Sequence, residues 1–124
     1  MNMCSVIMSI KPEFVYYIFT GEKVYEFRKR LCKRQVNRIY IYSTDPVKRV
    51  VGEAEIDSVL VESPEKVWEL THSGAGINKD FFDKYFENRA EAVAYKLKNV
   101  KKYKKPIQLS DFGILSAPQS YQYI

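Results

Sequence analysis

The segment Gly21-Glu22-Lys23-Val24-Tyr25-Glu26-Phe27-Arg28 places Lys, Glu and Arg within six residues, directly after a glycine and among apolar side chains. After its first residues it reads as an extended strand, in which Glu26 and Arg28 share one face and the aromatic residues share the other. Lys23 has the wrong parity to lie beside Glu26 in a regular strand. A turn or bulge after the glycine would bring the two together, and we expect the rest of the chain to hold this segment at the edge of a core.

The residues before this segment predict a strand followed by a short helix. Residues 4–10 form an apolar run that includes β-branched side chains, which is typical of a buried strand. Pro12 suits the first position of a helix, and apolar residues then recur at helical spacing. Gly21 can adopt the left-handed conformation that ends helices. We therefore expect a helix over residues 12–20.

The residues after this segment predict mostly strands, interrupted by two short helices. The expected strands cover residues 37–44, 48–61, 92–105 and 121–124. Gly52 lies inside the second of these and indicates a bulge or a close backbone approach. Ser63 and Asn78 are typical caps of the two helices. Because helices do not alternate regularly with strands, the pattern favours an α+β fold: a mostly antiparallel sheet, curled or closed into a β-barrel, with flanking short helices.

Length and composition fit one domain over residues 1–124. Hydrophobic residues make up 46% of the chain, so a core can form without disulfides or metal. Cys4 and Cys32 have no second Cys or His at ligand spacing, so we expect no metal and no cofactor. The sequence shows no signal peptide and no apolar run of membrane length, which favours a cytoplasmic protein without a membrane partner. It does not indicate an oligomeric state.

Charge is distributed unevenly along the chain. Lys and Arg outnumber Asp and Glu by ten to four over residues 1–50 and by six to one over 93–124, whereas acids outnumber bases by ten to four over 51–92. If the two basic ends come together, the protein has a basic face that suits a polyanion such as RNA; the alternative is a dispersed, solvated surface. The residues expected to contact a nucleic-acid backbone are Arg30, Lys33, Arg34, Arg38, Lys96, Lys98, Lys101 and Lys102.

The usual catalytic arrangements are missing from the sequence. His72 is the single histidine and falls at a helix end, and no Walker or GxGxxG loop is present. Lys23, Glu26 and Arg28 remain. Lys can donate to a carbonyl or phosphate, Glu can accept from an amine, and Arg can hold Glu or a phosphate. A desolvated lysine could also act as a base or nucleophile, and a structural ion pair is the alternative.

The spacing Gly21-x-Lys23-x-x-Glu26-x-Arg28 resembles the GxKxxExR signature of the ASCH family, a branch of the PUA-like β-barrels. The resemblance covers most of the chain, including the helix pair around Trp68. It implies a barrel of about six strands with flanking helices and a cleft lined by the signature. On this basis Lys23 and Glu26 are expected to contact the ligand, and Arg28 to orient Glu26. Weaker candidates for the cleft wall are Ser9, Tyr42, Ser43 and Ser120.

The resemblance also implies binding of RNA, a nucleotide or a modified nucleoside, with a role in transcription or translation. One ASCH branch is an amidohydrolase that deacetylates N4-acetylcytidine. This chain shares its lysine at Lys23, but has Glu26 in place of its Thr nucleophile and Gly74-Ala75-Gly76 in the region of its catalytic glutamate. We therefore favour a binding module over an enzyme, with Lys23 and Glu26 as the catalytic candidates. A third reading is a protein-interaction domain with a structural ion pair.

Overall fold

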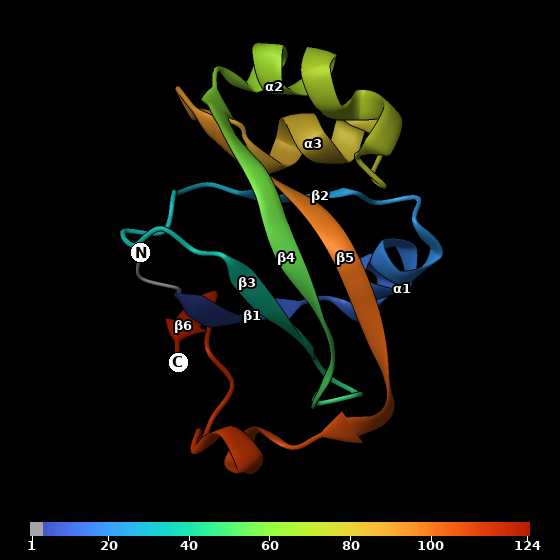
Figure 1. Ribbon diagram of the computed structural model, residues 1–124. Helices are drawn as coiled ribbons and strands as arrows, with labels where there is room; N and C mark the ends of the chain where they lie inside the picture. Colours follow the sequence, from blue (N-terminus) through green and yellow to red (C-terminus); the bar gives the residue numbers. More distant parts are fainter. Residues whose placement is uncertain (1–3) are drawn as a thin grey trace.

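Six strands form one curled sheet in the order β2-β5-β4-β3-β1-β6 in the computed structural model, which describes residues 4–124 (Figure 1). The strands are β1 (Ser5–Ile10), β2 (Tyr25–Arg28), β3 (Arg38–Ser43), β4 (Arg49–Glu62), β5 (Ala92–Ile107) and β6 (Tyr121–Tyr123). Every neighbouring pair is antiparallel except β1 with β3. The predicted α+β class with a curled, mostly antiparallel sheet is confirmed. The curl stops at a half-barrel, because β2 and β6 are the edges of the sheet and do not pair with each other.

The three α-helices in the described part of the chain are α1 (Pro12–Thr20), α2 (Pro64–Thr71) and α3 (Lys79–Tyr85). The bounds of α1 are those predicted. Pro12 occupies its first turn, and Gly21 ends it with φ 87° and donates its N–H to the carbonyl of Ile18. None of these helices is long and apolar enough to cross a membrane.

Gly52 positions α1 against the sheet. A Cβ added at Gly52 would lie 2.4 Å from the carbonyl oxygen of Lys101 and 2.7 Å from the ring of Phe19. The pairing register of β4 with β5 also shifts next to Gly52. The predicted bulge and close approach are therefore both present, and they let the last turn of α1 pack directly onto the β4–β5 pair.

The α2–α3 pair covers one end of the sheet, as Figure 1 shows at its top. The predicted caps are confirmed: Ser63 Oγ accepts from the Lys66 N–H at 3.3 Å, and Asn78 Oδ1 accepts from the Phe81 N–H at 2.8 Å. Together the helices bury an apolar cluster against β2 and β5. Its fully buried members are Phe27, Val67, Ala75, Phe82, Phe86, Ala92 and Ala94. This packing brings the connection between the two helices next to the start of β2.

The acidic residues of β4 lie beside basic residues of the neighbouring strands. Arg38 pairs with Glu53 and with Glu55, and Asp57 lies 4.0 Å from Lys96 Nζ and 3.7 Å from Lys98 Nζ. Opposite charges therefore interleave across the sheet, because the acidic middle of the sequence forms the strand that the basic segments flank. Arg38, Lys96 and Lys98 of the basic segments are therefore paired with acids of β4.

Candidate functional site

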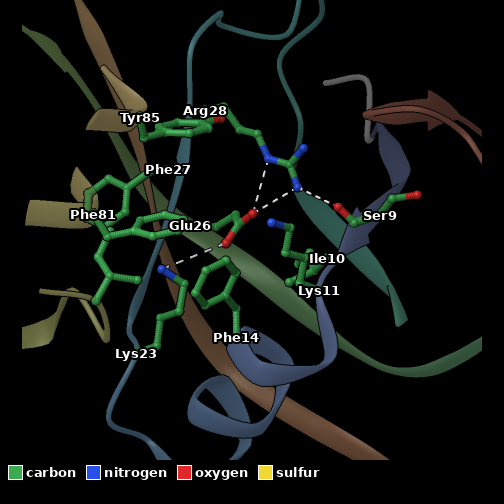
Figure 2. A pocket seen from close by; sticks show the side chains of 11 residues that line it. Ser9, Ile10, Lys11, Phe14, Lys23, Glu26, Phe27, Arg28, Phe81 and Tyr85 are labelled. Carbon is green, nitrogen blue, oxygen red and sulfur yellow. Dashed lines mark hydrogen bonds and ion pairs between the residues drawn. The ribbon is translucent and has the colours of Figure 1, made fainter. Parts of the chain in front are cut away.

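A cavity of about 170 Å³ lies where the curled sheet stays open, between β2 and the junction of β1 with α1 (Figure 2). We call it the seam cavity. Its lining residues come from β1, α1, β2 and the α2–α3 region: Ser9, Ile10, Lys11, Phe14, Lys23, Glu26, Phe27, Arg28, Ile77, Phe81 and Tyr85. The open edge of the half-barrel thus brings the charged segment at residues 21–28 to a hollow in the surface.

Arg28 fixes Glu26 and also bridges the open seam. Its Nε and Nη2 donate to Glu26 Oε2 at 3.1 and 2.8 Å. Nη2 also donates to the carbonyl oxygen of Ser9 at 2.9 Å, and Nη1 donates to Ser120 Oγ at 3.1 Å. The pairing of Glu26 with Arg28 that strand parity predicts is confirmed. It leaves Glu26 Oε1 directed away from Arg28 and toward Lys23, as Figure 2 shows.

Lys23 is buried, with 3% of its surface exposed, although it lies just before β2. Its backbone forms a bridge with Ala75, and its Nζ donates to the Ala75 carbonyl at 2.9 Å. Nζ lies 4.0 Å from Glu26 Oε1 and 4.8 Å from the centre of the Phe27 ring. In a regular strand Lys23 and Glu26 would lie on opposite faces. The connection between α2 and α3 instead holds Lys23 beside Glu26.

Gly76 allows this close approach. It has φ +65°, and a Cβ at this position would lie 2.4 Å from the Cβ of Lys23. The neighbouring Val24 N–H donates to the Gly74 carbonyl at 2.8 Å, so the chain is fixed on both sides of Ala75. The contact of Gly74-Ala75-Gly76 with Lys23 was not predicted from the sequence. Two glycines around one small residue were the available signal.

Lys23 loses its proton more readily in the cavity than an exposed lysine does in water. Burial lowers the pKa of Lys23; the nearby Glu26 carboxylate opposes this shift, and Arg28 adds to it. The side chain that donates to Ala75 can still donate toward the cavity, since an ammonium carries three protons. Glu26 Oε1 and Lys23 Nζ therefore form an adjacent acceptor and donor, suited to a ligand that offers a donor beside an acceptor.

Aromatic side chains form much of the cavity wall. The rings of Phe14 on α1 and Phe81 on α3 meet edge to face with centres 5.3 Å apart. Tyr85 lies on the same side of the cavity as Phe81, and Lys29 Nζ lies 4.7 Å above its ring. Burial raises the pKa of Tyr85, so its hydroxyl remains protonated at neutral pH. Nothing in the sequence indicates that α3 lies opposite α1, so these aromatics were not predicted to share one cavity wall.

Of the seven expected cleft residues, four line the cavity, a fifth is hydrogen-bonded to one of them, and two are not among the lining residues. Ser9 lines the cavity with Lys23, Glu26 and Arg28, and Ser120 touches it through Arg28. Tyr42 and Ser43 are not among its described lining residues. Tyr42 pairs in register with Ser9, but its side chain packs with Ile7, Val50 and Ile114. Arg28 contacts the backbone carbonyl of Ser9. The side chains of Ser9 and Tyr42 lie on the same face of β1 and β3, and this face points away from the cavity.

The eight residues expected to contact a nucleic-acid backbone lie on other parts of the surface. None of them is among the described residues that line the seam cavity, where the exposed cation is Lys11; Lys29 lies over the ring of Tyr85. Three of the eight, Arg38, Lys96 and Lys98, are held in ion pairs with acids of β4. Contact of all eight with phosphates stays a prediction.

Comparison with known proteins gives consistent matches over nearly the whole chain. Residues 3–119 match the family described as a domain of unknown function, DUF365. The chain is 30% identical over 123 residues to an ASCH domain-containing ribonuclease of Zymomonas mobilis, with 95% of this chain and 82% of that protein covered. The crystal structure of ASCH from Zymomonas mobilis superposes with a TM-score of 0.87 at 29% identity, covering 97% of this chain and 87% of that one.

A second kind of relative is longer. The chain is 30% identical over 121 residues to large ribosomal subunit protein uL22 of Ureaplasma parvum, a match that covers 97% of this chain. It spans only 39% of the length of that relative. The match therefore concerns part of the ribosomal protein.

Proposed function

The chain belongs to the ASCH domain proteins and to the DUF365 family, and from this we propose that it binds RNA and takes one nucleotide of the strand into the seam cavity. The observation that carries the proposal is the adjacent acceptor and donor, Glu26 Oε1 and Lys23 Nζ, within an aromatic wall. A nucleobase offers both features that such a site recognises: a flat face for stacking and an edge with neighbouring donors and acceptors.

The size of the cavity sets how much of the nucleotide enters. At about 170 Å³ it is smaller than the roughly 300–1,000 Å³ of pockets that enclose drug-sized ligands. One base can enter, while the ribose and phosphate stay outside. We expect two exposed lysines to contact the phosphate: Lys11, which lines the cavity, and Lys29, which lies over the ring of Tyr85. A base can reach the site only when it is unpaired. We therefore expect single strands, loops or bulges to bind and regular duplexes to bind weakly.

RNA binding is tested with a labelled ten-nucleotide single strand and the duplex of the same sequence, titrated at several salt concentrations. We expect tighter binding of the single strand, and log K should fall with log[salt] by about 0.7 for each phosphate neutralised. Phe81→Ala should cost about 1–3 kcal/mol through lost stacking. Lys79→Met is the matched control, because Lys79 pairs with Asp83 on the exposed side of α3. Equal affinity for duplex and single strand, or full binding by Phe81→Ala, would refute the proposal.

Cleavage of the bound RNA is a second candidate, favoured by the relative that is named a ribonuclease. Lys23 supports it, because a lysine whose pKa is lowered by burial can accept a proton, such as that of a 2′-hydroxyl, more readily than an exposed one. An amidohydrolase is less well supported, since Glu26 is the one carboxylate among the described lining residues and Arg28 holds it. RNA that is bound but stays intact would leave binding as the function, and equal cutting by Lys23→Met would exclude Lys23 as the proton acceptor.

A role in translation is the finer part of the proposal. It is supported by the name of the longer ribosomal relative and by the expected affinity for RNA. Recovery of the protein with ribosomal fractions at low salt and its loss at high salt would support it. Absence from those fractions at low salt would contradict it.

A further inference from the structure

The second half of β4 has a free edge. β3 pairs with β4 only from Arg49 to Glu55, and the last contact on that side is the Ile56 N–H donating to the Asn37 carbonyl at 2.9 Å. Residues 58–62 pair with β5 on their other side, and no described residue pairs with residues 57–62 on the β3 side. Every second residue of this stretch therefore directs its N–H and C=O away from β5, which is the arrangement that accepts another strand.

A groove of about 520 Å³ runs along this free edge. Residues 31–37 form one wall of the groove, and the β4 residues from Ile56 to Val61 form the other. Three of its apolar side chains are unusually exposed: Leu31 by 50%, Val59 by 39% and Val61 by 38%. The opposite wall is fixed, since the Cys32 N–H donates to the Tyr95 hydroxyl at 2.9 Å. The groove thus has an apolar lining, a strand edge on one side and a held segment on the other.

Part of β5 is also unpaired on one side, and lysines there protect it from pairing with another strand. β2 pairs with β5 only over residues 93–96, and past this point β5 carries lysines at positions 98, 101, 102, 104 and 105. Charged side chains of this kind discourage strand pairing. The free edge of β4 instead reads Ser-Val-Leu-Val over residues 58–61 and has no charge there. It is the edge left open to a partner.

Charge indicates which partner fits. The acid beside the edge, Asp57, already faces Lys96 and Lys98. On the opposite wall Lys33 and Arg34 are exposed, and neither forms an ion pair with a described residue. A second copy of the chain suits the edge poorly, because antiparallel pairing of residues 57–62 with themselves would set Asp57 opposite Glu62.

We propose that this groove binds an extended, acidic and apolar peptide segment of a partner protein, which adds to residues 57–62 of β4 as a strand. Its backbone pairs with the free edge, its apolar side chains cover Val59, Val61 and Leu31, and its acidic side chains face Lys33 and Arg34. The site is separate from the seam cavity and does not depend on RNA binding.

The test uses a fluorescein-labelled, N-acetylated peptide of eight alternating Val and Glu residues, measured by anisotropy. The control is the same peptide methylated at alternate backbone nitrogens, which cannot donate to a strand edge. We expect Arg34→Glu and Val59→Lys each to weaken binding at least tenfold. The matched variants on β5, Lys104→Glu and Val100→Lys, change a charge and an exposed valine outside the groove and should bind as the wild type does.

Hydrogen exchange supplies a second readout that does not depend on a variant folding. Amides within residues 57–62 should exchange more slowly once the peptide is bound, whereas amides of β3 should be unaffected. Equal binding of the methylated peptide overturns the proposal. So does unchanged peptide binding by Arg34→Glu when the same variant loses affinity for single-stranded RNA, because the wall would then be a nucleic-acid surface.

Discussion

Gly76 offers a direct test of how Lys23 is held. An alanine there would adopt φ +65°, which costs an L-residue about 1–2 kcal/mol. Its Cβ would also lie 2.4 Å from the Cβ, 2.8 Å from the Cγ and 3.0 Å from the Cα of Lys23. Carbon atoms in contact are normally about 3.5–4.0 Å apart, so one of the two segments must move by more than about 1 Å. Overpacking of this kind costs about 1–3 kcal/mol. The expected loss for Gly76→Ala is therefore about 2–5 kcal/mol.

Gly113 provides the matched control. It also has a positive φ, +74°, but nothing lies within 4 Å of a Cβ added there. Gly113→Ala should lose only the conformational part, about 1–2 kcal/mol. The difference between the two variants then isolates the contact with Lys23.

Urea unfolding followed by the fluorescence of Trp68 measures both losses. Trp68 is a suitable reporter because it is the single tryptophan and its ring lies 4.9 Å from that of Phe82. RNA binding should weaken in Gly76→Ala and stay unchanged in Gly113→Ala. Equal destabilisation by the two substitutions would show that the packing of Gly76 on Lys23 does not hold the site, and would refute the reasoning.

Substitutions at three further positions test the energetics of the site and of one cap. Burial lowers the pKa of Lys23 below the usual lysine value of 10.5, so between the lowered pKa and 10.5 the unfolded chain binds more protons than the folded one. In that pH window the stability of the wild type, measured by urea titration, should therefore rise with pH relative to that of Lys23→Met. Parallel pH profiles of the two proteins would contradict this. Glu26→Gln leaves Arg28 without its carboxylate and should cost about 3 kcal/mol by thermal unfolding, whereas a loss well under 1 kcal/mol would indicate a solvent-screened pair. Asn78→Ala should cost about 1 kcal/mol in urea and Asn78→Asp much less, because the aspartate can still accept from the Phe81 N–H; equal losses would exclude the cap.

Local features of the fold could be predicted from the sequence because their signals are local. Pro12 and Gly21 define the ends of α1, and Ser63 and Asn78 cap the next two helices. Gly52 likewise marked a place where another segment approaches the backbone. Each of these predictions depends on the conformation or hydrogen bonding of one residue and its near neighbours, so no knowledge of the tertiary arrangement was needed.

The composition of the site depends on contacts between distant segments, and there the sequence was a weaker guide. Strand parity paired Glu26 with Arg28, but nothing local indicated that the carbonyl of Ala75 would receive Lys23. Tyr42 was placed at the cleft, yet its direction follows from the parallel pairing of β3 with β1, which alternation alone does not reveal. The same holds for the ion pairs of Lys96 and Lys98, since cross-strand neighbours are set by the register of β4 with β5.

Because β2 and β6 do not pair across the seam, no backbone hydrogen bonds fix the curvature of the sheet there. Within each strand pair the backbone ladder fixes the spacing, but across the seam β2 reaches β1 and the residues before β6 through the side chain of Arg28. The angle between the two ends of the sheet is therefore held by side-chain contacts and not by a backbone ladder. A molecule held by Glu26 and Lys23 on one side and by the β1–α1 junction on the other would stiffen it, and would stabilise the whole protein by about 2.7 kcal/mol at a hundred times its Kd.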